Sequence, residues 1–103
     1  MYDEENVWVV AFIDPECGYC RKLAYQWERV RISKTVRTRR VKLGYVDVTY
    51  EESKYIVSQY CAGYRIEYTP TIFLYGRDKY APVVYDGDYS AKDIAVFVGG
   101  YCD

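Results

Sequence analysis

Two cysteines separated by two residues, at the point where a strand gives way to a helix, constrain this chain more than any other feature. Residues 7–13 are a continuous run of β-branched and other apolar side chains, typical of a strand buried on both faces. An Asp-Pro pair ends that run. From Gly18 onward, apolar residues recur at spacings of three and four, which predicts an amphipathic helix. Cys17 and Cys20 therefore belong to the first turn of a helix that follows a buried strand.

The start of a helix is a favourable place for a reactive thiol. Unsatisfied N–H groups and the positive end of the helix dipole favour a thiolate at Cys17. Cys20 lies within one turn and can attack a mixed disulfide formed at Cys17. The alternatives are half of a zinc site or two inert core thiols. Zinc needs further ligands, and the chain has no histidine and no second close cysteine pair. The pattern predicts a redox pair with no metal site and no cofactor.

The middle of the chain predicts a second strand followed by a second helix. The first helix is expected to end between residues 34 and 38. Residues 41–48 alternate well enough for a strand. Thr49 and Glu52 match the capping-box signature, which predicts a second helix that runs to about Cys61.

The last third of the chain predicts two more strands and a helix. Residues 71–75 and 82–85 form the strands of a hairpin. Ser90 is the expected cap of the final helix, and Gly99 and Gly100 are its expected stop. The order β-α-β-α-β-β-α predicts an α/β domain with one parallel pair of strands and one hairpin.

Length and charge set the remaining limits. The chain has 103 residues, which suits one domain over residues 1–103, and a net charge of −1 gives no indication of nucleic acid or of an acidic membrane. No apolar run reaches the roughly 18 residues of a membrane helix. Met1 is followed by acidic residues, so no signal peptide is expected. A cytosolic protein, a mature form and an excised domain all remain open.

Several short motifs match one family over nearly the whole chain. They are Val10-x-Phe12, Pro15-x-Cys17-Gly18-x-Cys20, Arg21, Leu23, Trp27, residues 41–43 and 46–49, Tyr64-x-Ile66, Thr69-Pro70-Thr71, residues 85–87 and Asp93-Ile94. With these motifs the chain resembles the protein disulfide isomerases, without the first strand–helix pair usual in that family. The resemblance implies a minimal thioredoxin fold, in which helices flank a central mixed sheet of four strands. It also implies thiol–disulfide exchange on cysteine-containing proteins or peptides, in the endoplasmic reticulum lumen or another secretory compartment.

The resemblance also implies roles for individual residues. Cys17 is the nucleophile and Cys20 the resolving thiol. Pro70 is expected to follow a cis peptide bond and to face the pair, and the Thr69 backbone to bond an extended substrate. Tyr19 is expected to contact substrate as well.

Side chains around these residues are candidates for binding substrate and for tuning the thiols. Tyr64, Ile66 and Tyr68 are candidates for a substrate groove, with ordinary packing of the loop before Pro70 as an equal alternative. Four charged residues are expected to tune the cysteine pKa values. Arg21 and Lys22 lower the pKa of Cys17, Glu16 opposes them, and Asp14 is a substitute proton acceptor near solvent.

Five positions depart from the family pattern, one of them Tyr25 in place of a helix-kinking proline. Ala11 replaces a buried glutamate, Tyr19 a histidine and Glu16 a tryptophan, and Tyr89 lies near the position of an arginine. These losses predict a slower and less oxidising enzyme, suited to reduction or isomerisation. They also motivate an alternative, an interaction module or assembly subunit with little turnover. A glutaredoxin-type enzyme is a weaker alternative, since Gly87-Asp88 replaces the Gly-Gly of that family's glutathione site.

Two further features, the remaining cysteines and a run of basic residues, are expected to have no special function. Cys61 and Cys102 are expected not to form a disulfide within one chain, because the topology places them apart. The basic run over residues 29–42 is expected to be a solvated helix end rather than a docking face for an acidic partner.

Overall fold

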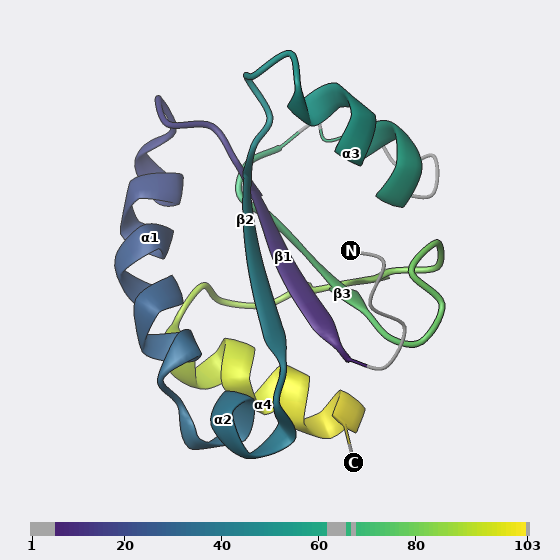
Figure 1. The fold of residues 1–103 in the computed structure, drawn as a ribbon. Helices are drawn as coiled ribbons and strands as arrows, with labels where there is room; N and C mark the ends of the chain where they lie inside the picture. The colour runs from purple at the N-terminus through teal and green to yellow at the C-terminus, as the bar shows by residue number, and fades with distance from the viewer. Residues whose placement is uncertain (1–5, 62–65, 67, 103) are drawn as a thin grey trace.

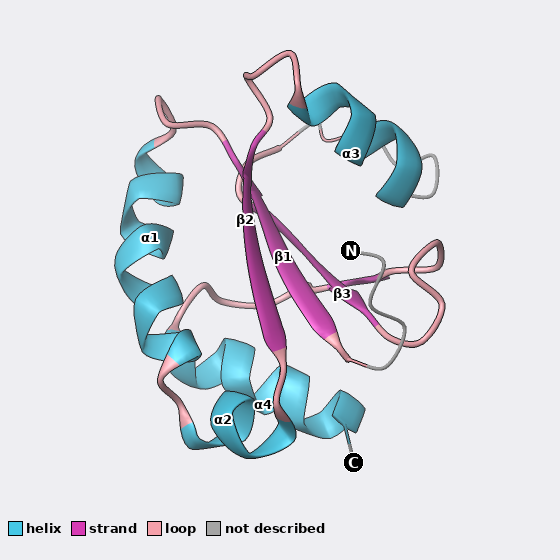
Figure 2. Ribbon diagram, viewed as in Figure 1, coloured by secondary structure: helices cyan, strands magenta, loops and turns pink. Residues whose placement is uncertain are grey.

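The computed structural model describes residues 6–61, 66 and 68–102, and shows one sheet with helices on both faces (Figures 1 and 2). The elements, in chain order, are β1 (Trp8–Ile13), α1 (Gly18–Arg31), α2 (Lys34–Arg39), β2 (Lys42–Asp47), α3 (Ser53–Tyr60), β3 (Thr71–Tyr75), β4 (Val83–Val84) and α4 (Ala91–Cys102). No helix in the described part of the chain is long and apolar enough to cross a bilayer.

The sheet has the order β2-β1-β3-β4. β1 runs parallel to β2, with Trp8 opposite Lys42 and Ala11 opposite Tyr45. β1 runs antiparallel to β3, and β3 antiparallel to β4. The predicted parallel pair, the predicted hairpin and the four-stranded mixed sheet of the minimal thioredoxin fold are therefore all confirmed.

The central strand β1 is buried on both faces, as its composition predicts. Its odd-numbered residues Val9, Ala11 and Ile13 share one core cluster with side chains of α1, α2, β3 and α4, and that cluster includes Cys20. Its even-numbered residues Val10 and Phe12 pack on the other face against side chains of α3 and β3. This two-residue alternation gives each face of the strand its own core (Figure 1).

The first helix ends earlier than predicted. α1 ends at Arg31, and a second short helix, α2, starts after Ser33. The hydroxyl of Ser33 accepts the backbone N–H of Val36 at 3.4 Å and so caps the new helix. Ser33 is a suitable N-cap residue, but the basic residues on both sides of it are compatible with the end of one long helix as well as with two separate helices.

The predicted capping box does not form. The carboxylate of Asp47 accepts the backbone N–H of Thr49 at 2.9 Å and its hydroxyl at 2.6 Å, so Thr49 closes a turn instead. α3 then starts at Ser53, after Glu52, whose side chain makes no capping hydrogen bond. The Asp47 carboxylate, two residues before Thr49, binds the hydroxyl that would otherwise cap the helix.

Ser90 caps the last helix as predicted, but the expected stop is wrong. The Ser90 hydroxyl accepts the Asp93 N–H at 3.2 Å. α4 continues through Gly99 and Gly100 because its end packs on the rest of the fold: a side chain at Gly99 would reach Thr35 at 3.4 Å, and one at Gly76 would overlap Tyr101. These tertiary contacts outweigh a helix penalty of about 1 kcal/mol for each glycine. β4 is also shorter than predicted.

Candidate active site

A tight turn after β1 delivers Cys17 to the start of α1. The carbonyl of Asp14 accepts the Cys17 N–H at 3.0 Å, and its carboxylate accepts the Glu16 N–H at 2.9 Å. Cys17 is the N-cap residue of α1, and its Sγ accepts the backbone N–H of Cys20 at 3.4 Å. The Asp-Pro pair that ends the strand in the sequence thus builds the turn that positions the thiol.

The two cysteines differ in exposure. Cys17 is partly exposed, whereas Cys20 is 1% exposed and belongs to the core cluster beneath α1. A thiol of another molecule can reach Cys17 first. The burial of Cys20 keeps a sulfur of another molecule from reaching it directly.

The loop before β3 lies against the exposed thiol. The Cys17 thiol donates to the carbonyl oxygen of Thr69 at 3.2 Å. The Thr69–Pro70 peptide bond is cis, and Pro70 is buried. Tyr89, in the loop before α4, donates its hydroxyl to the Pro70 carbonyl at 3.0 Å. Three segments far apart in sequence therefore meet at Cys17.

The pKa values of the two thiols move in opposite directions. The side chains of Cys20 and then Thr69, followed by the Cys20 backbone N–H, lower the pKa of Cys17. The hydrogen bond to the Thr69 carbonyl favours the neutral thiol, but the net direction is downward. Burial raises the pKa of Cys20, against a backbone hydrogen bond from Asp14. At neutral pH, Cys17 is therefore the better nucleophile.

We expect brief iodoacetamide treatment of the reduced protein at neutral pH to label Cys17 and to spare Cys20. The labelling rate should rise with pH and level off at a pH below the ordinary thiol pKa, because the thiolate of Cys17 forms earlier. Mass mapping of peptides at a series of pH values measures both effects. Preferential labelling of Cys20 would contradict the assignment of the nucleophile.

The charged residues expected to tune these thiols lie near the pair, but they are not the causes of the shift in the Cys17 pKa. Arg21 lines a cavity of about 350 Å³ beside Cys20. The Lys22 ammonium lies 5.7 Å from the ring centroid of Tyr19. Glu16 is exposed, and the Asp14 carboxylate is occupied by the turn. Their influence on the pair stays a prediction.

The predicted substrate residues divide between two places. Tyr19, in the first turn of α1, is 68% exposed, and Tyr68, in the loop that carries Thr69, is 80% exposed. Ile66 instead packs against the α3 face and lines a hollow with Val57 of that helix. Tyr64 lies outside the described residues. The structure therefore brings Tyr19, Thr69 and Pro70 together around the pair and leaves Ile66 with the second core.

Tyr45 is a neighbour of the pair that sequence reasoning missed. Its hydroxyl donates to the Cys20 carbonyl at 3.4 Å, and it lines the cavity beside Cys20 together with Asp47. It lies opposite Ala11, the position of the family's glutamate. Burial and then the Cys20 charge raise the pKa of Tyr45, so the phenol stays neutral. Strand alternation indicates the face on which Tyr45 lies, but the parallel register that pairs it with Ala11 was not predictable.

The remaining cysteines are separate from the site. Cys61 is a free, buried thiol at the end of α3, and burial raises its pKa to about 11. The side chain of Cys102 is not among those described, but the free thiol of Cys61 agrees with the prediction that the two do not pair. In the described part of the chain, no three His, Cys, Asp or Glu residues gather to hold a metal ion.

Comparison with known proteins gives a consistent result. The family model described as Thioredoxin matches residues 1–99. The chain is 37% identical to Protein disulfide-isomerase 2-3 of Arabidopsis thaliana over 92% of this chain and 20% of that protein. It is 36% identical to Protein disulfide-isomerase A6 of Mus musculus over 89% of this chain and 20% of that protein.

A solved structure supports the fold. The J-Trx1 fragment of ERdj5 superposes with a TM-score of 0.71 at 22% identity, over 97% of this chain and 43% of that one. At this identity the likeness concerns the fold alone. The chain spans about a fifth of the length of the curated relatives it matches.

Proposed function

Because the chain belongs to the thioredoxin family, we propose that it exchanges thiols and disulfides on cysteine-containing proteins and peptides through Cys17 and Cys20. One observation carries the proposal. Cys17 Sγ is partly exposed at the N-cap of α1, 3.4 Å from the Cys20 N–H and 3.2 Å from the Thr69 carbonyl. This geometry supplies a stabilised thiolate, a resolving thiol within one turn and a backbone edge for a substrate in one place.

The chemistry takes two displacement steps. The Cys17 thiolate attacks one sulfur of a substrate disulfide; a Cys17–substrate disulfide forms, and the other substrate sulfur leaves and takes up a proton. Cys20 then loses its proton and attacks Cys17 Sγ, which forms the Cys17–Cys20 disulfide and releases the second substrate thiolate. Two electrons pass from the protein dithiol to the substrate. The reverse sequence oxidises a substrate dithiol.

An extended substrate segment would bond the Thr69 backbone. Thr69 lies two residues before β3, and its carbonyl is within hydrogen-bond distance of Cys17. A segment bonded there as an added strand would hold its cysteine against Cys17. Two exposed side chains are proposed to contact it, Tyr19 in the first turn of α1 and Tyr68 in the loop before β3.

The preferred direction is reduction or isomerisation. Ala11, which lies in the same core cluster as Cys20, cannot accept its proton, and Tyr19 adds no cation beside Cys17. Tyr89 is no substitute for an arginine: burial, and then the charges of Cys20 and Cys17, raise its pKa, so its phenol is neutral. Less thiolate stabilisation makes a dithiol less oxidising.

The setting of this activity follows from the resemblance alone. We place it in the endoplasmic reticulum lumen or another secretory compartment, with protein cysteines as substrates and with no role for nucleic acid, membrane or cofactor. The upstream redox partner is not identified.

Insulin reduction separates this function from a thioredoxin-like interaction module. With dithiothreitol as the electron source, we expect the protein to shorten the lag before insulin precipitates, in proportion to its concentration, because its thiolate attacks disulfides faster than the small thiol does. A lag equal to that of the C17S variant would support an interaction module instead.

A further inference from the structure

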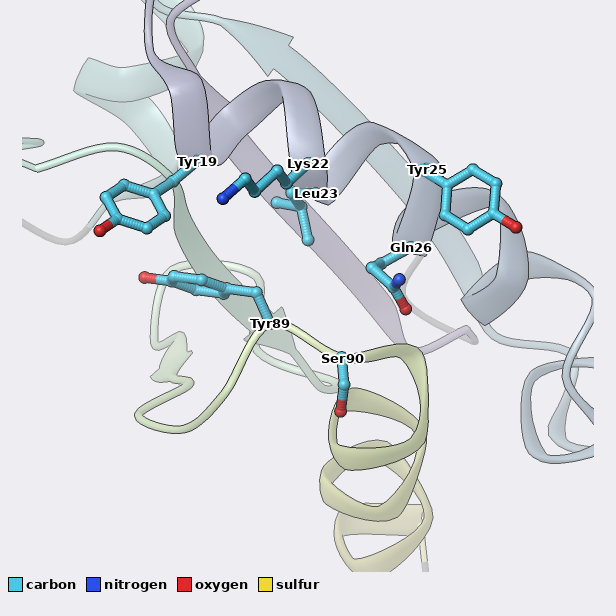
Figure 3. A pocket seen from close by; sticks show the side chains of 7 residues that line it. All are labelled: Tyr19, Lys22, Leu23, Tyr25, Gln26, Tyr89 and Ser90. Atoms are coloured by element: carbon cyan, nitrogen blue, oxygen red, sulfur yellow. The ribbon is translucent and has the colours of Figure 1, made fainter.

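A groove near the redox pair is lined by three tyrosines together with Lys22, Leu23, Gln26 and Ser90. It has a volume of about 490 Å³ and lies between α1 and the loop that enters α4 (Figure 3). Tyr19, Lys22 and Tyr25 line it from α1, and Tyr89 from the loop. Figure 3 shows the rings of Tyr19 and Tyr89 on opposite sides of one end, with the Lys22 amine extended toward Tyr19. We call this the tyrosine groove.

The tyrosine groove lies near the reactive thiol. Tyr19 lies between Cys17 and Cys20 in the sequence, and Tyr89 donates its hydroxyl to the carbonyl of Pro70. The residue before that proline is Thr69, whose carbonyl accepts the Cys17 thiol. A chain attached to Cys17 would therefore have its flanking side chains within reach of the groove.

The polar groups of the groove are mostly occupied within the protein. The Gln26 side-chain oxygen accepts the Ala91 N–H at 2.9 Å, and the Ser90 hydroxyl accepts the Asp93 N–H at 3.2 Å. The remaining surface is aromatic: Tyr19 and Tyr25 are 68% and 69% exposed. An aromatic partner gains both apolar burial and ring–ring contact from such a surface.

Lys22 gives the groove a charge preference. Its ammonium lies 5.7 Å from the Tyr19 ring centroid, close enough for a cation–π contact. Among residues 6–61, 66 and 68–102, no carboxylate forms an ion pair with Lys22. A carboxylate of a bound chain would therefore meet a cation without having to displace an internal partner.

We propose that the tyrosine groove selects substrate segments in which an aromatic side chain lies two positions from the cysteine and an acidic side chain lies beside that aromatic residue. The proposal rests on the proposed function, since it needs a substrate cysteine at Cys17. In an extended segment, side chains two positions apart point to the same side, so the aromatic ring and the cysteine face the protein together. The neighbouring carboxylate approaches Lys22 from the rim.

Three peptides of equal length test the proposal. One carries phenylalanine two positions from the cysteine with glutamate beside it, one has alanine at both positions, and one keeps the phenylalanine but has lysine in place of glutamate. Each cysteine forms a mixed disulfide with a chromogenic aryl thiol, and so does free cysteine, which serves as the reference. The second-order rate of aryl thiol release by the reduced protein is divided by the rate with the reference.

We expect the acidic aromatic peptide to react about tenfold faster than the alanine peptide, which corresponds to burial of one ring. It should react about threefold faster than the basic aromatic peptide, the range of an exposed ion pair. K22E should reverse the order of the two aromatic peptides, and Y25A should at least halve the preference for phenylalanine. The controls K54E and Y50A change exposed residues of α3 and of the loop before it, on the other face of the sheet from α1 and α4, and should keep the wild-type ratios.

Equal ratios for the three peptides, with a normal rate on the reference disulfide, would overturn the proposal and leave the proposed function standing. The same holds if K54E changes the charge preference as much as K22E does. A reference rate no higher than that of the C17S variant would overturn the proposed function, and this proposal with it.

Discussion

Replacing Cys17 with serine should lower the rate of insulin reduction by about a thousandfold or more, to the rate of dithiothreitol alone. Cys17 is the partly exposed thiol, its pKa is lowered, and it lies beside the Thr69 carbonyl. A serine hydroxyl at the same place forms no thiolate and no disulfide. C61A is the matched control: Cys61 is a buried, free thiol, and burial raises its pKa to about 11, so its loss should leave the rate unchanged.

The partner variant C20S should stop the reaction at its midpoint. Cys17 would still attack, but no thiol would be present to release the substrate, so a covalent Cys17–substrate adduct should accumulate and disappear on reduction. Non-reducing electrophoresis and peptide mapping detect it. Equal adduct in C17S, or activity of C17S close to that of C61A, would contradict the assigned roles.

Adding the missing glutamate and histidine together should raise the rate at which the protein oxidises a dithiol peptide by about a hundredfold, the lower end of general acid–base catalysis. Ala11 is fully buried in the cluster that contains Cys20, so a carboxyl there would have a raised pKa and could take the proton of Cys20 near pH 7. A histidine at Tyr19 would add a cation beside Cys17 and raise the reduction potential.

The same change should cost stability. A carboxyl group buried at position 11 should lower the free energy of unfolding by about 3 kcal/mol, measured in urea. The control A11Q/Y19H has a side chain of the same size without an acid, and should lose stability without gaining rate. If A11E/Y19H oxidises the peptide no faster than A11Q/Y19H, the slow exchange of the parent protein does not come from the missing carboxylate.

The elements of the fold were largely predictable because the strands are strongly patterned. Residues 71–75 matched β3 in full, and the run at residues 7–13 contains β1, since each contains consecutive apolar side chains that suit only a buried strand. The errors fell at helix ends, where local signals compete. Asp47 binds the N–H and the hydroxyl of Thr49, and the packing of α4 against α2 lets α4 continue past its predicted stop.

The candidate site was predictable only where its residues are adjacent in sequence. Cys17 and Cys20 can be identified from their spacing and from the predicted strand before them. Thr69 and Pro70 came from family resemblance. The contacts of Tyr45 and Tyr89 depend on strand register and on the path of the loop before α4. Neither is encoded in a local pattern, and for the same reason the tyrosine groove could not be read from the sequence.

The reduction potential of the Cys17–Cys20 pair, measured by equilibration with glutathione buffers, tests the central claim most directly. We predict a reversible two-electron couple nearer to the potential of thioredoxin, about −270 mV, than to that of protein disulfide isomerase, about −180 mV. The pair is redox-active because its two thiols lie within one helical turn, and the absence of a histidine at position 19 keeps it reducing. A pair that does not titrate, or one at about −180 mV or above, would contradict the account.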